Sequence, residues 1–362
     1  MASDDRIQEQ LMGALRRVIE PTANKSVLDL GFVRAARVAD GAAWIDYELP
    51  EQLVGSPVEQ ELRLRTNAAL HMTAGVERVE IRVAARPGRA TNTLPGVKNV
   101  IAVGAGKGGV GKSTLSVLLA LGLKRRGQSA GLLDADVYGP SLPKLTGTET
   151  AQAEGTADGR ILPPESDDGL KVMSMGYLVP ANEVVVWRGP MAQKYVKEFL
   201  DRGAWGELDH LIVDLPPGTG DIPLTLSQSI PLTGAVVVCT PQDVALLDAL
   251  KAYRMYRKLN VPVLGFVENM SYYLNPATGA REYIFGNGGV ERAARANDVP
   301  YLGGLPLHQL IRESGDAGSP KDCFTHAPAH VTEALDQIVT NLLEQVRVRR
   351  AEATPLPQLR IR

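Results

Sequence analysis

The chain has 362 residues, enough for roughly two or three domains of average size. Its 39 basic and 41 acidic residues give a formal net charge of −2, which argues against a general polyanion binder and a polybasic membrane-docking protein. A hydrophobic content of 44% and a charged content of 22% are ordinary for a globular protein and exclude wholesale disorder. The two cysteines, Cys239 and Cys323, are too few for a disulfide framework or for a four-thiolate metal site within one chain.

Residues 1–85 predict a small α+β domain. Apolar residues recur at helical spacing over residues 4–20, and a second helical pattern covers Pro57–Ala74. Between these helices, Asp40-Gly41 separates two strand-like segments, which predicts a β-hairpin. The expected strands are Ser26–Val38, Ala42–Leu49 and Val76–Val83.

Residues 86–98 are rich in Pro, Gly and Asn and are expected to form a linker. From 99 to 346, short apolar runs alternate with helical patterns, which predicts an α/β fold with a mainly parallel sheet flanked by helices. The last helical pattern, Val331–Val346, is strongly amphipathic, and the basic tail 347–362 is expected to be a solvated end. The apolar runs expected to be strands are Val100–Val103, Ala130–Leu133, Leu211–Val213, Ala235–Cys239, Val261–Val267 and Tyr301–Leu305.

A glycine-rich segment after the first of these strands has the pattern G-x-x-x-x-G-K-[ST]. It lies between an apolar strand and the helical run Leu115–Lys124, which is the context that a phosphate-binding loop needs. Its glycines let backbone N–H groups surround phosphate oxygens, and the helix N-terminus adds a favourable dipole. Lys112 is expected to pair with the β- and γ-phosphates of ATP, and Ser113 to ligate Mg²⁺. The expected nucleotide-binding residues of the loop are Gly106, Lys107, Gly108, Gly109, Val110, Gly111, Lys112, Ser113 and Thr114.

Aspartates stand at the ends of two other expected strands. Asp134 and Asp136 are two residues apart, so in an extended chain both carboxylates can face the nucleotide side. Asp214 ends an apolar run in a Walker B pattern and is expected to hold Mg²⁺ directly or through water.

The loop sequence K-G-G-V-G-K-S-T, with its additional Lys107, resembles the signature of the deviant Walker A P-loop ATPases, which include the MinD and ParA groups. The resemblance implies a homodimer with ATP at the interface, in which Lys107 reaches the phosphates bound by the neighbour. It also implies that Asp136 orients the attacking water and that Asp134 supports the metal or its waters. Hydrolysis of ATP is expected to be slow, because closure and product release gate such switches.

Longer strings resemble one branch of that group, the Mrp/ApbC/NBP35 proteins, which carry and assemble iron–sulfur clusters. The resemblance covers about residues 95–345 and implies iron–sulfur client or assembly proteins as partners. In relatives, the positions of Asn269 and Pro306 frame the adenine base. The strings that carry the resemblance are Asp136–Ser141, Arg188–Met191, Asp214–Asp221 and Val267–Ser271.

The N-terminal domain is similar to the MIP18-like domain that often precedes bacterial Mrp proteins. The similarity is carried by Ser26–Val33, which resembles the string S-I-V-D-L-G-x-V of that domain. The usual D-P-E before this string reads Glu20-Pro21-Thr22, and the usual cysteine near residues 50–57 is absent.

The branch pattern breaks where a C-x-x-C is expected after the N-M-S string. The expected thiols fall at Asn275 and Thr278, whose neutral oxygens are poorly matched to iron–sulfide. Cys239 ends an apolar strand and is expected to be buried. Cys323 follows a loop, so for this residue an exposed thiol is the alternative to a buried one. An iron–sulfur cluster is therefore doubtful, and the chain is expected to be an accessory form of the family.

An ATP-switched dimeric scaffold of MinD or ParA type, without a cluster, is the alternative. Thr354–Arg362 contains two prolines and no aromatic residue, which weighs against a membrane anchor, and the near-neutral charge gives DNA binding little support. We therefore expect no nucleic-acid partner and no membrane partner. The acidic, polar N-terminus lacks the features of a signal peptide, so a cytoplasmic location is expected.

Overall fold

The computed structural model describes residues 10–21, 25–39, 41–50, 53–73, 76–86, 94–136, 139–177 and 189–353. The chain divides into two compact units, Met1–Thr91 and Asn92–Arg362, called here the smaller and the larger unit. Among the helices in the described ranges, none combines the length and apolar character that crossing a membrane requires.

The smaller unit is a three-stranded sheet covered by a helix. Strands β3 (Val33–Ala39) and β4 (Ala42–Pro50) are antiparallel neighbours, and β4 pairs in parallel with β5 (Arg78–Arg86). Helix α2 (Pro57–His71) makes the crossover, and it begins where the Ser56 hydroxyl accepts from the Glu59 N–H. Alternate residues of β4, such as Tyr47, face the apolar core of this unit.

Two expectations for the smaller unit are wrong in detail. The strand expected over Ser26–Val38 is interrupted, because β2 (Lys25–Ser26) leads into turns through Gly31 before β3 begins. Gly31 has a φ of +61°, which an extended strand cannot contain. The helix expected over 4–20 ends at residue 16 within the described residues, because β1 (Ile19–Glu20) pairs with β2.

The larger unit is built on an eight-stranded sheet in which every pairing but one is parallel. The neighbour order is β10-β7-β11-β6-β12-β13-β14, with β15 paired to β13, and only the β13–β14 pair is antiparallel. This arrangement confirms the expected mainly parallel sheet. The strands are β6 (Val97–Ala105), β7 (Ala130–Asp134), β10 (Lys171–Ser174), β11 (Leu208–Asp214), β12 (Gly234–Cys239), β13 (Val263–Leu274), β14 (Arg281–Glu282) and β15 (Tyr301–Leu307).

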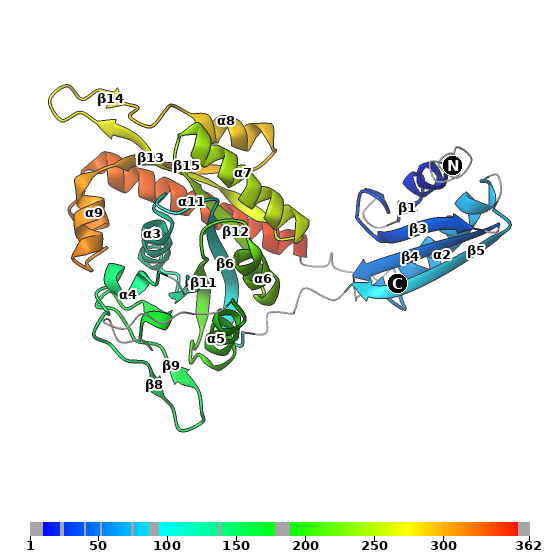
Figure 1. Ribbon diagram of the computed structural model, residues 1–362, viewed down its shortest axis with the longest axis horizontal. Coiled ribbons are helices and arrows are strands. Elements are labelled where there is room, and N and C mark those ends of the chain that lie inside the picture. Colours follow the sequence, from blue (N-terminus) through cyan, green and yellow to red (C-terminus); the bar gives the residue numbers. More distant parts are fainter. Residues whose placement is uncertain are drawn as a thin grey trace, which may run out of the picture. The chain divides into compact units, whose positions relative to one another are not determined.

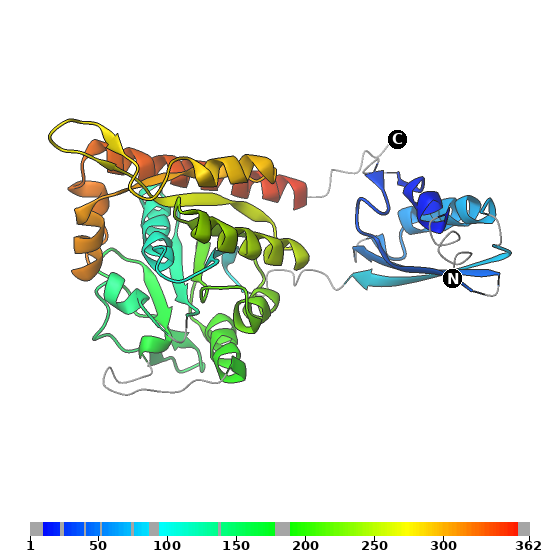
Figure 2. The ribbon, with the colours of Figure 1, turned by 45° about the horizontal axis from the view of Figure 1, so that its top comes forward.

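Helices cover both faces of this sheet, as Figures 1 and 2 show. Successive residues of β6 belong to different cores: Ile101 packs with the helices of one face and Ala102 with those of the other. Helices α3 (Lys112–Arg125) and α11 (Ala329–Ala353) cover the first face. The opposite face is covered by α5 (Gly189–Arg202), α6 (Asp221–Ser229), α7 (Asp243–Lys258) and α8 (Gly289–Ala296).

Short elements complete the larger unit. Edge strand β10 was not expected, since its four residues are too few to show a strand period. Helix α11 continues to Ala353, so residues 347–353 of the expected tail are helical. The remaining short elements are α4 (Leu142–Leu145), β8 (Glu154–Gly155), β9 (Ile161–Leu162), a 3₁₀ turn (Met175–Tyr177), α9 (Gln309–Asp316) and α10 (Asp322–Thr325).

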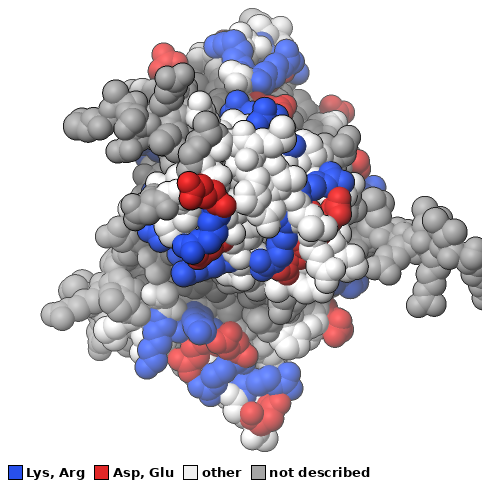
Figure 3. Space-filling view, turned by 90° about the vertical axis from the view of Figure 1, so that its right-hand side faces the viewer, with Lys and Arg blue, Asp and Glu red and all other residues white. Residues whose placement is uncertain are grey.

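The charged side chains are mixed in sign on the face that Figure 3 shows, where basic and acidic groups lie interspersed around an uncharged area. This mixture agrees with a formal net charge of −2. Several sequence-based expectations fall on residues that the structure does not describe. These residues are 1–9, Thr22, Asp40, residues 51 and 52, Ala74, residues 87–93 of the expected linker, Val137, Tyr138, Arg188 and 354–362.

Candidate nucleotide site

The candidate site lies where the carboxyl ends of three parallel strands meet. Strand β11 is paired on one side with β6 and on the other with β7, so Asp214 stands opposite both Val103 and Asp134. The glycine-rich loop follows β6 at the same edge and leads directly into α3 at Lys112. Parallel register therefore brings the loop and the aspartates together, although they are far apart in the chain.

Two glycines of the loop are required by close approaches of other segments. Gly111 has a φ of +81°, and a Cβ at this position would collide with the Asn269 side-chain nitrogen. A Cβ at Gly106 would collide with the backbone of Asp248 in α7. Gly109 also has a positive φ, of +80°, but a Cβ there would meet nothing within 4 Å. The loop is thus shaped both by its own dihedral angles and by its neighbours.

Lys112 and Ser113 converge on one buried carboxylate. The Lys112 ammonium donates to Asp214 Oδ2 at 2.7 Å, and the Ser113 hydroxyl donates to the same oxygen at 2.5 Å. The Lys112 side chain is 7% exposed and the Asp214 side chain is fully buried. The second carboxylate oxygen accepts from the Ser116 hydroxyl at 2.7 Å. Ser116 has no place in the sequence motif, although its position three residues after Ser113 on α3 places it on the same helix face.

Asp134 is also buried, and the chain itself saturates its carboxylate. It accepts from the N–H groups of Asp136, Ser141 and Leu142 and from the Ser174 hydroxyl, at 3.0 to 3.1 Å. Burial, and next the negative charge of Asp214, raise the pKa of Asp134 to about 7. These contacts make Asp134 the anchor of the segment after β7.

Asp136 lies at the edge of this cluster. Its carboxylate is 3.7 Å from the Lys112 ammonium, and its side chain is 15% exposed. Burial raises the pKa of Asp136, while the Lys112 charge acts in the opposite direction. A carboxylate near the loop, with access to solvent and a raised pKa, has the properties of a group that accepts a proton or orients water.

Lys107 stands apart from the other charged groups of the loop. Its side chain is half-buried, and it makes no ion pair within 4.0 Å with any residue that the structure describes. Of the other expected loop residues, Val110 is buried, Thr114 is half-buried and Gly108 is exposed.

Asn269 and Pro306 come from neighbouring strands beside the loop. The Asn269 side chain is 8% exposed and donates to the Val110 carbonyl at 2.8 Å, so it braces the loop. Asn269 is paired with Leu305, which precedes the buried Pro306. The next residue, Met270, has a φ of +55°, and the β13–β15 register shifts after Asn269. This irregular backbone at the sheet edge had no signal in the sequence pattern.

The positions expected for cluster ligands lie in the loop that joins β13 to β14. Asn275 accepts from the N–H groups of Ala277 and Thr278, and its amide donates to Glu282 at 2.6 Å. These contacts form a turn held by side-chain oxygen and nitrogen, with no thiol.

Both cysteines lie away from the surface. Cys239 and Cys323 are each 1% exposed. The alternative that Cys323 exposes its thiol is wrong, because it lies on α10, which packs against α9 and α11, and its sulfur lies 2.9 Å from the Ser314 hydroxyl. Burial raises the pKa of the Cys323 thiol and that of Cys239, the latter to about 12. Neither sulfur is placed to bind a cluster at the surface.

The chain is similar to known proteins over most of its length. Residues 96–343 match a family described as "ParA: NUBPL iron-transfer P-loop NTPase". A protein of Deinococcus radiodurans named "Iron-sulfur cluster carrier protein" is 42% identical over 96% of this chain and 98% of its own length. A protein of Escherichia coli K12 with the same name is 42% identical over 88% of this chain and 87% of its own. A solved nucleotide-binding protein from Archaeoglobus fulgidus, in complex with ADP, is 38% identical, with a TM-score of 0.58, and the match covers 65% of this chain and 91% of that one.

Proposed function

The chain belongs to the NUBPL iron-transfer family of P-loop NTPases, and from this premise we propose that it is a slow cytoplasmic Mg-ATPase acting in iron–sulfur cluster assembly or transfer. We propose further that it works as a homodimer with ATP at the interface and as an accessory form without the usual cluster ligands. Its partners would then be iron–sulfur client or assembly proteins. The relatives named as cluster carriers do not favour the alternative of a scaffold unrelated to iron–sulfur chemistry.

The convergence of Lys112, Ser113 and Asp214 carries the nucleotide part of this proposal. The Lys112 ammonium, at the start of α3, donates to Asp214 Oδ2 at 2.7 Å. Phosphate oxygens would compete with this carboxylate for the ammonium, because a charged donor interacts strongly with either anion. The ADP found in the Archaeoglobus fulgidus structure supports a nucleotide as the ligand.

The donor set at Asp214 fits Mg²⁺. The Ser113 hydroxyl and the Asp214 carboxylate are hard oxygen ligands, and they already lie 2.5 Å apart. These two residues would hold the ion, which would supply charge neutralisation to the transferring phosphate. Asp134 would act less directly, since its carboxylate oxygens already accept four hydrogen bonds.

The catalytic roles follow from the remaining charges. Asp136 would orient the attacking water, because it lies beside Lys112 and retains access to solvent. Lys107 would stabilise the negative charge that develops on the phosphates bound by a second copy. Its half-buried ammonium has no carboxylate within ion-pair distance among the described residues, which supports this role.

The residues of the β13–β14 loop do not fit an iron–sulfur cluster as cargo. Asn275 and Thr278 offer neutral oxygen and nitrogen, whereas iron–sulfide clusters are held by thiolates. Asn275 is also committed to the turn by three hydrogen bonds. This disagreement is the reason for proposing an accessory role.

A kinetic experiment separates the two lysines. Lys112→Ala should abolish ATP hydrolysis and weaken ATP binding, because it removes the phosphate-binding ammonium. Lys107→Ala should lower turnover by about tenfold or more while leaving the affinity for ATP nearly unchanged. The control is Lys258→Ala, at an exposed position near the end of α7, which should behave as wild type. Unchanged turnover in Lys107→Ala would exclude the role of this lysine in a dimer.

Anaerobic reconstitution with iron and sulfide tests the accessory role. The wild-type chain should hydrolyse ATP yet retain little iron, because neither cysteine is exposed. The double variant Asn275→Cys with Thr278→Cys should gain about two irons per chain, as expected if two copies share one four-iron cluster. Stable binding of about two irons per chain by the wild type would overturn the accessory role without affecting the ATPase proposal.

A further inference from the structure

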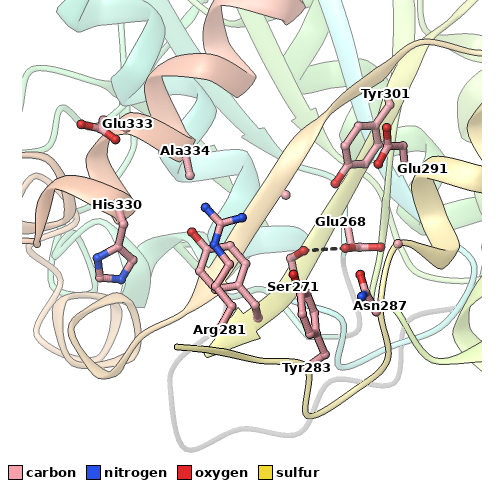
Figure 4. A pocket seen from close by; sticks show the side chains of 13 residues that line it. Glu268, Ser271, Arg281, Tyr283, Asn287, Glu291, Tyr301, His330, Glu333 and Ala334 are labelled. Atoms are coloured by element: carbon pink, nitrogen blue, oxygen red, sulfur yellow. Dashed lines mark hydrogen bonds between the residues drawn. The ribbon is translucent and has the colours of Figure 1, made fainter. Parts of the chain in front are cut away.

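A polar cavity of about 390 Å³ lies at the edge of the sheet in the larger unit. Strands β13 and β15, the N-terminal end of α8, the first turns of α11 and the segment around β14 surround it (Figure 4). The nucleotide loop does not contribute to its walls. Glu268 lines this cavity, whereas the next residue, Asn269, donates to the nucleotide loop. Successive residues of a strand point to opposite faces, so the cavity is distinct from the nucleotide site although both share β13.

The cavity contains a buried carboxylate that has no cationic partner in the part of the chain that the structure describes. Glu268 is 2% exposed and accepts from the Ser271 hydroxyl at 2.5 Å and from the Val290 N–H at 3.2 Å. In the described ranges it makes no ion pair within 4.0 Å. A buried carboxylate is ordinarily stabilised by a cation or a metal in addition to neutral donors.

The other charges of the lining strengthen this imbalance. Glu333 on α11 and Glu291 on α8 add two carboxylates, and Arg281 is the only guanidinium among the described residues of the lining. Neither Glu333 nor Arg281 forms an ion pair with a described residue within 4.0 Å, and Glu291 is paired outward with Arg295 at 2.6 Å. The lining therefore carries more negative than positive charge, and the field within it favours a cation.

Aromatic rings supply the second feature that an organic cation requires. Tyr272, Tyr283 and Tyr301 all line the cavity. The guanidinium of Arg281 already lies over the Tyr272 ring, 4.4 Å from its centroid, which shows that this ring accepts a planar cation. In Figure 4, Arg281 stands between the His330–Glu333 side of the cavity and the Ser271–Glu268 side. The chain's own arginine thus marks the position that a guanidinium can take.

An unsatisfied polar atom completes the pattern. His330 lines the cavity, and its buried Nε2 has no hydrogen-bond partner among the described residues. Buried polar atoms are almost always paired in folded proteins, by protein, water or ligand. Burial, and next the neighbouring His308 and Arg281, lower the pKa of His330, so its neutral ring can accept an N–H from a ligand.

The geometry points to a binding site for an organic cation that carries a guanidinium or primary ammonium group, held by Glu268 and Glu333 among the tyrosine rings of the lining. The volume exceeds what one such head group needs, so the site can admit either a small free molecule or a basic side chain of another protein. The carboxylates and aromatic rings of the lining would bind the cationic group of either ligand in the same way.

Isothermal titration of the full chain, without nucleotide and at constant ionic strength, tests this site. The probes are agmatine as a free cation and blocked arginine, N-acetyl-arginine-methylamide, as a mimic of a protein side chain. Saturable binding with a dissociation constant below about 1 mM is expected for at least one of them. Tighter binding of agmatine indicates a small molecule as the natural ligand, and tighter binding of blocked arginine indicates a protein side chain.

Charge variants make the test specific. Glu333→Gln, at an exposed position of α11, and Glu268→Gln should each weaken binding by about fivefold or more. Glu344→Gln is the matched control, because it lies on the same helix, is 60% exposed and does not line the cavity. Arg281→Gln should strengthen binding, because it removes a like charge and frees the Tyr272 ring.

Three results would overturn the site: no saturation by either probe, equal loss in Glu344→Gln and Glu333→Gln, or loss of binding in Arg281→Gln. The last result, together with binding of glutamate, would identify an anion site built on Arg281. None of these measurements depends on ATP hydrolysis, so the outcome is separate from that of the proposed function.

Discussion

Replacing Gly111 by alanine is expected to destabilise the larger unit more than the same replacement at Gly109. The two glycines have nearly equal dihedral angles, with φ of +81° and +80°. They differ in surroundings, because a Cβ at 111 collides with the Asn269 side chain whereas a Cβ at 109 meets nothing within 4 Å. The pair therefore separates backbone strain from the loss of one tertiary contact.

The expected losses of stability follow from backbone strain and from the contact with Asn269. An L-residue in the left-handed region costs about 1–2 kcal/mol, and this cost applies to both variants. Gly111→Ala must in addition displace Asn269 and break its 2.8 Å bond to the Val110 carbonyl. Losing that bond and leaving a buried polar group unpaired costs about 1–3 kcal/mol more. We therefore expect about 1–2 kcal/mol for Gly109→Ala and about 2–5 kcal/mol for Gly111→Ala.

Urea unfolding of the full chain measures this difference. Hydrogen exchange of peptides from α3 and β6 reports on the larger unit alone, since both elements belong to it. The Asn269→Ala background is the control, because it removes the side chain that alanine at 111 would strike. There, the costs of the two glycine variants should become equal to within about 0.5 kcal/mol.

The reasoning fails if the two glycine variants are equally destabilised in the wild-type background. It also fails if Gly111→Ala keeps its additional cost after Asn269 has been truncated. Either result would mean that the additional cost of Gly111→Ala does not come from the contact between Asn269 and the loop.

Two further predictions concern buried titratable groups. Cys239 and Cys323, each 1% exposed and with raised pKa values, should react with a thiol reagent such as DTNB only after unfolding, and rapid labelling of the folded chain would contradict their burial. Burial lowers the pKa of His210 from 6.5 to about 4, so the unfolded chain binds a proton at this residue more tightly than the folded chain does. The free energy of unfolding should therefore fall by up to about 3 kcal/mol as the pH drops from about 6.5 to 4. The stability difference between wild type and His210→Gln, measured by urea unfolding along this pH range, isolates that slope, because the opposite contribution from the raised pKa of Asp134 is present in both proteins. A pH-independent difference would contradict the assignment to His210.

Local pattern alone predicted the position of the glycine-rich loop and the parallel sheet. The loop follows β6 and opens α3, and the apolar runs are strands of one sheet, because turn chemistry and hydrophobic period are properties of neighbouring residues. The sequence also showed directly that positions 275 and 278 carry Asn and Thr and not cysteine. The sequence did not predict the short edge strand β10 or the interruption before β3, because two to four residues are too few to show a strand period.

Only the tertiary structure decided how distant residues meet. Strand register set Asp214 beside Asp134, and the irregular backbone at Met270 belongs to the strand end where Asn269 meets the Val110 carbonyl. Packing of α10 against α9 and α11 buried Cys323, which followed a loop in the sequence. The cavity at Glu268 arises from segments that are separate in the chain. Such contacts depend on the register of strands and on the packing of helices that are far apart in the chain. A pattern of neighbouring residues predicts neither of these.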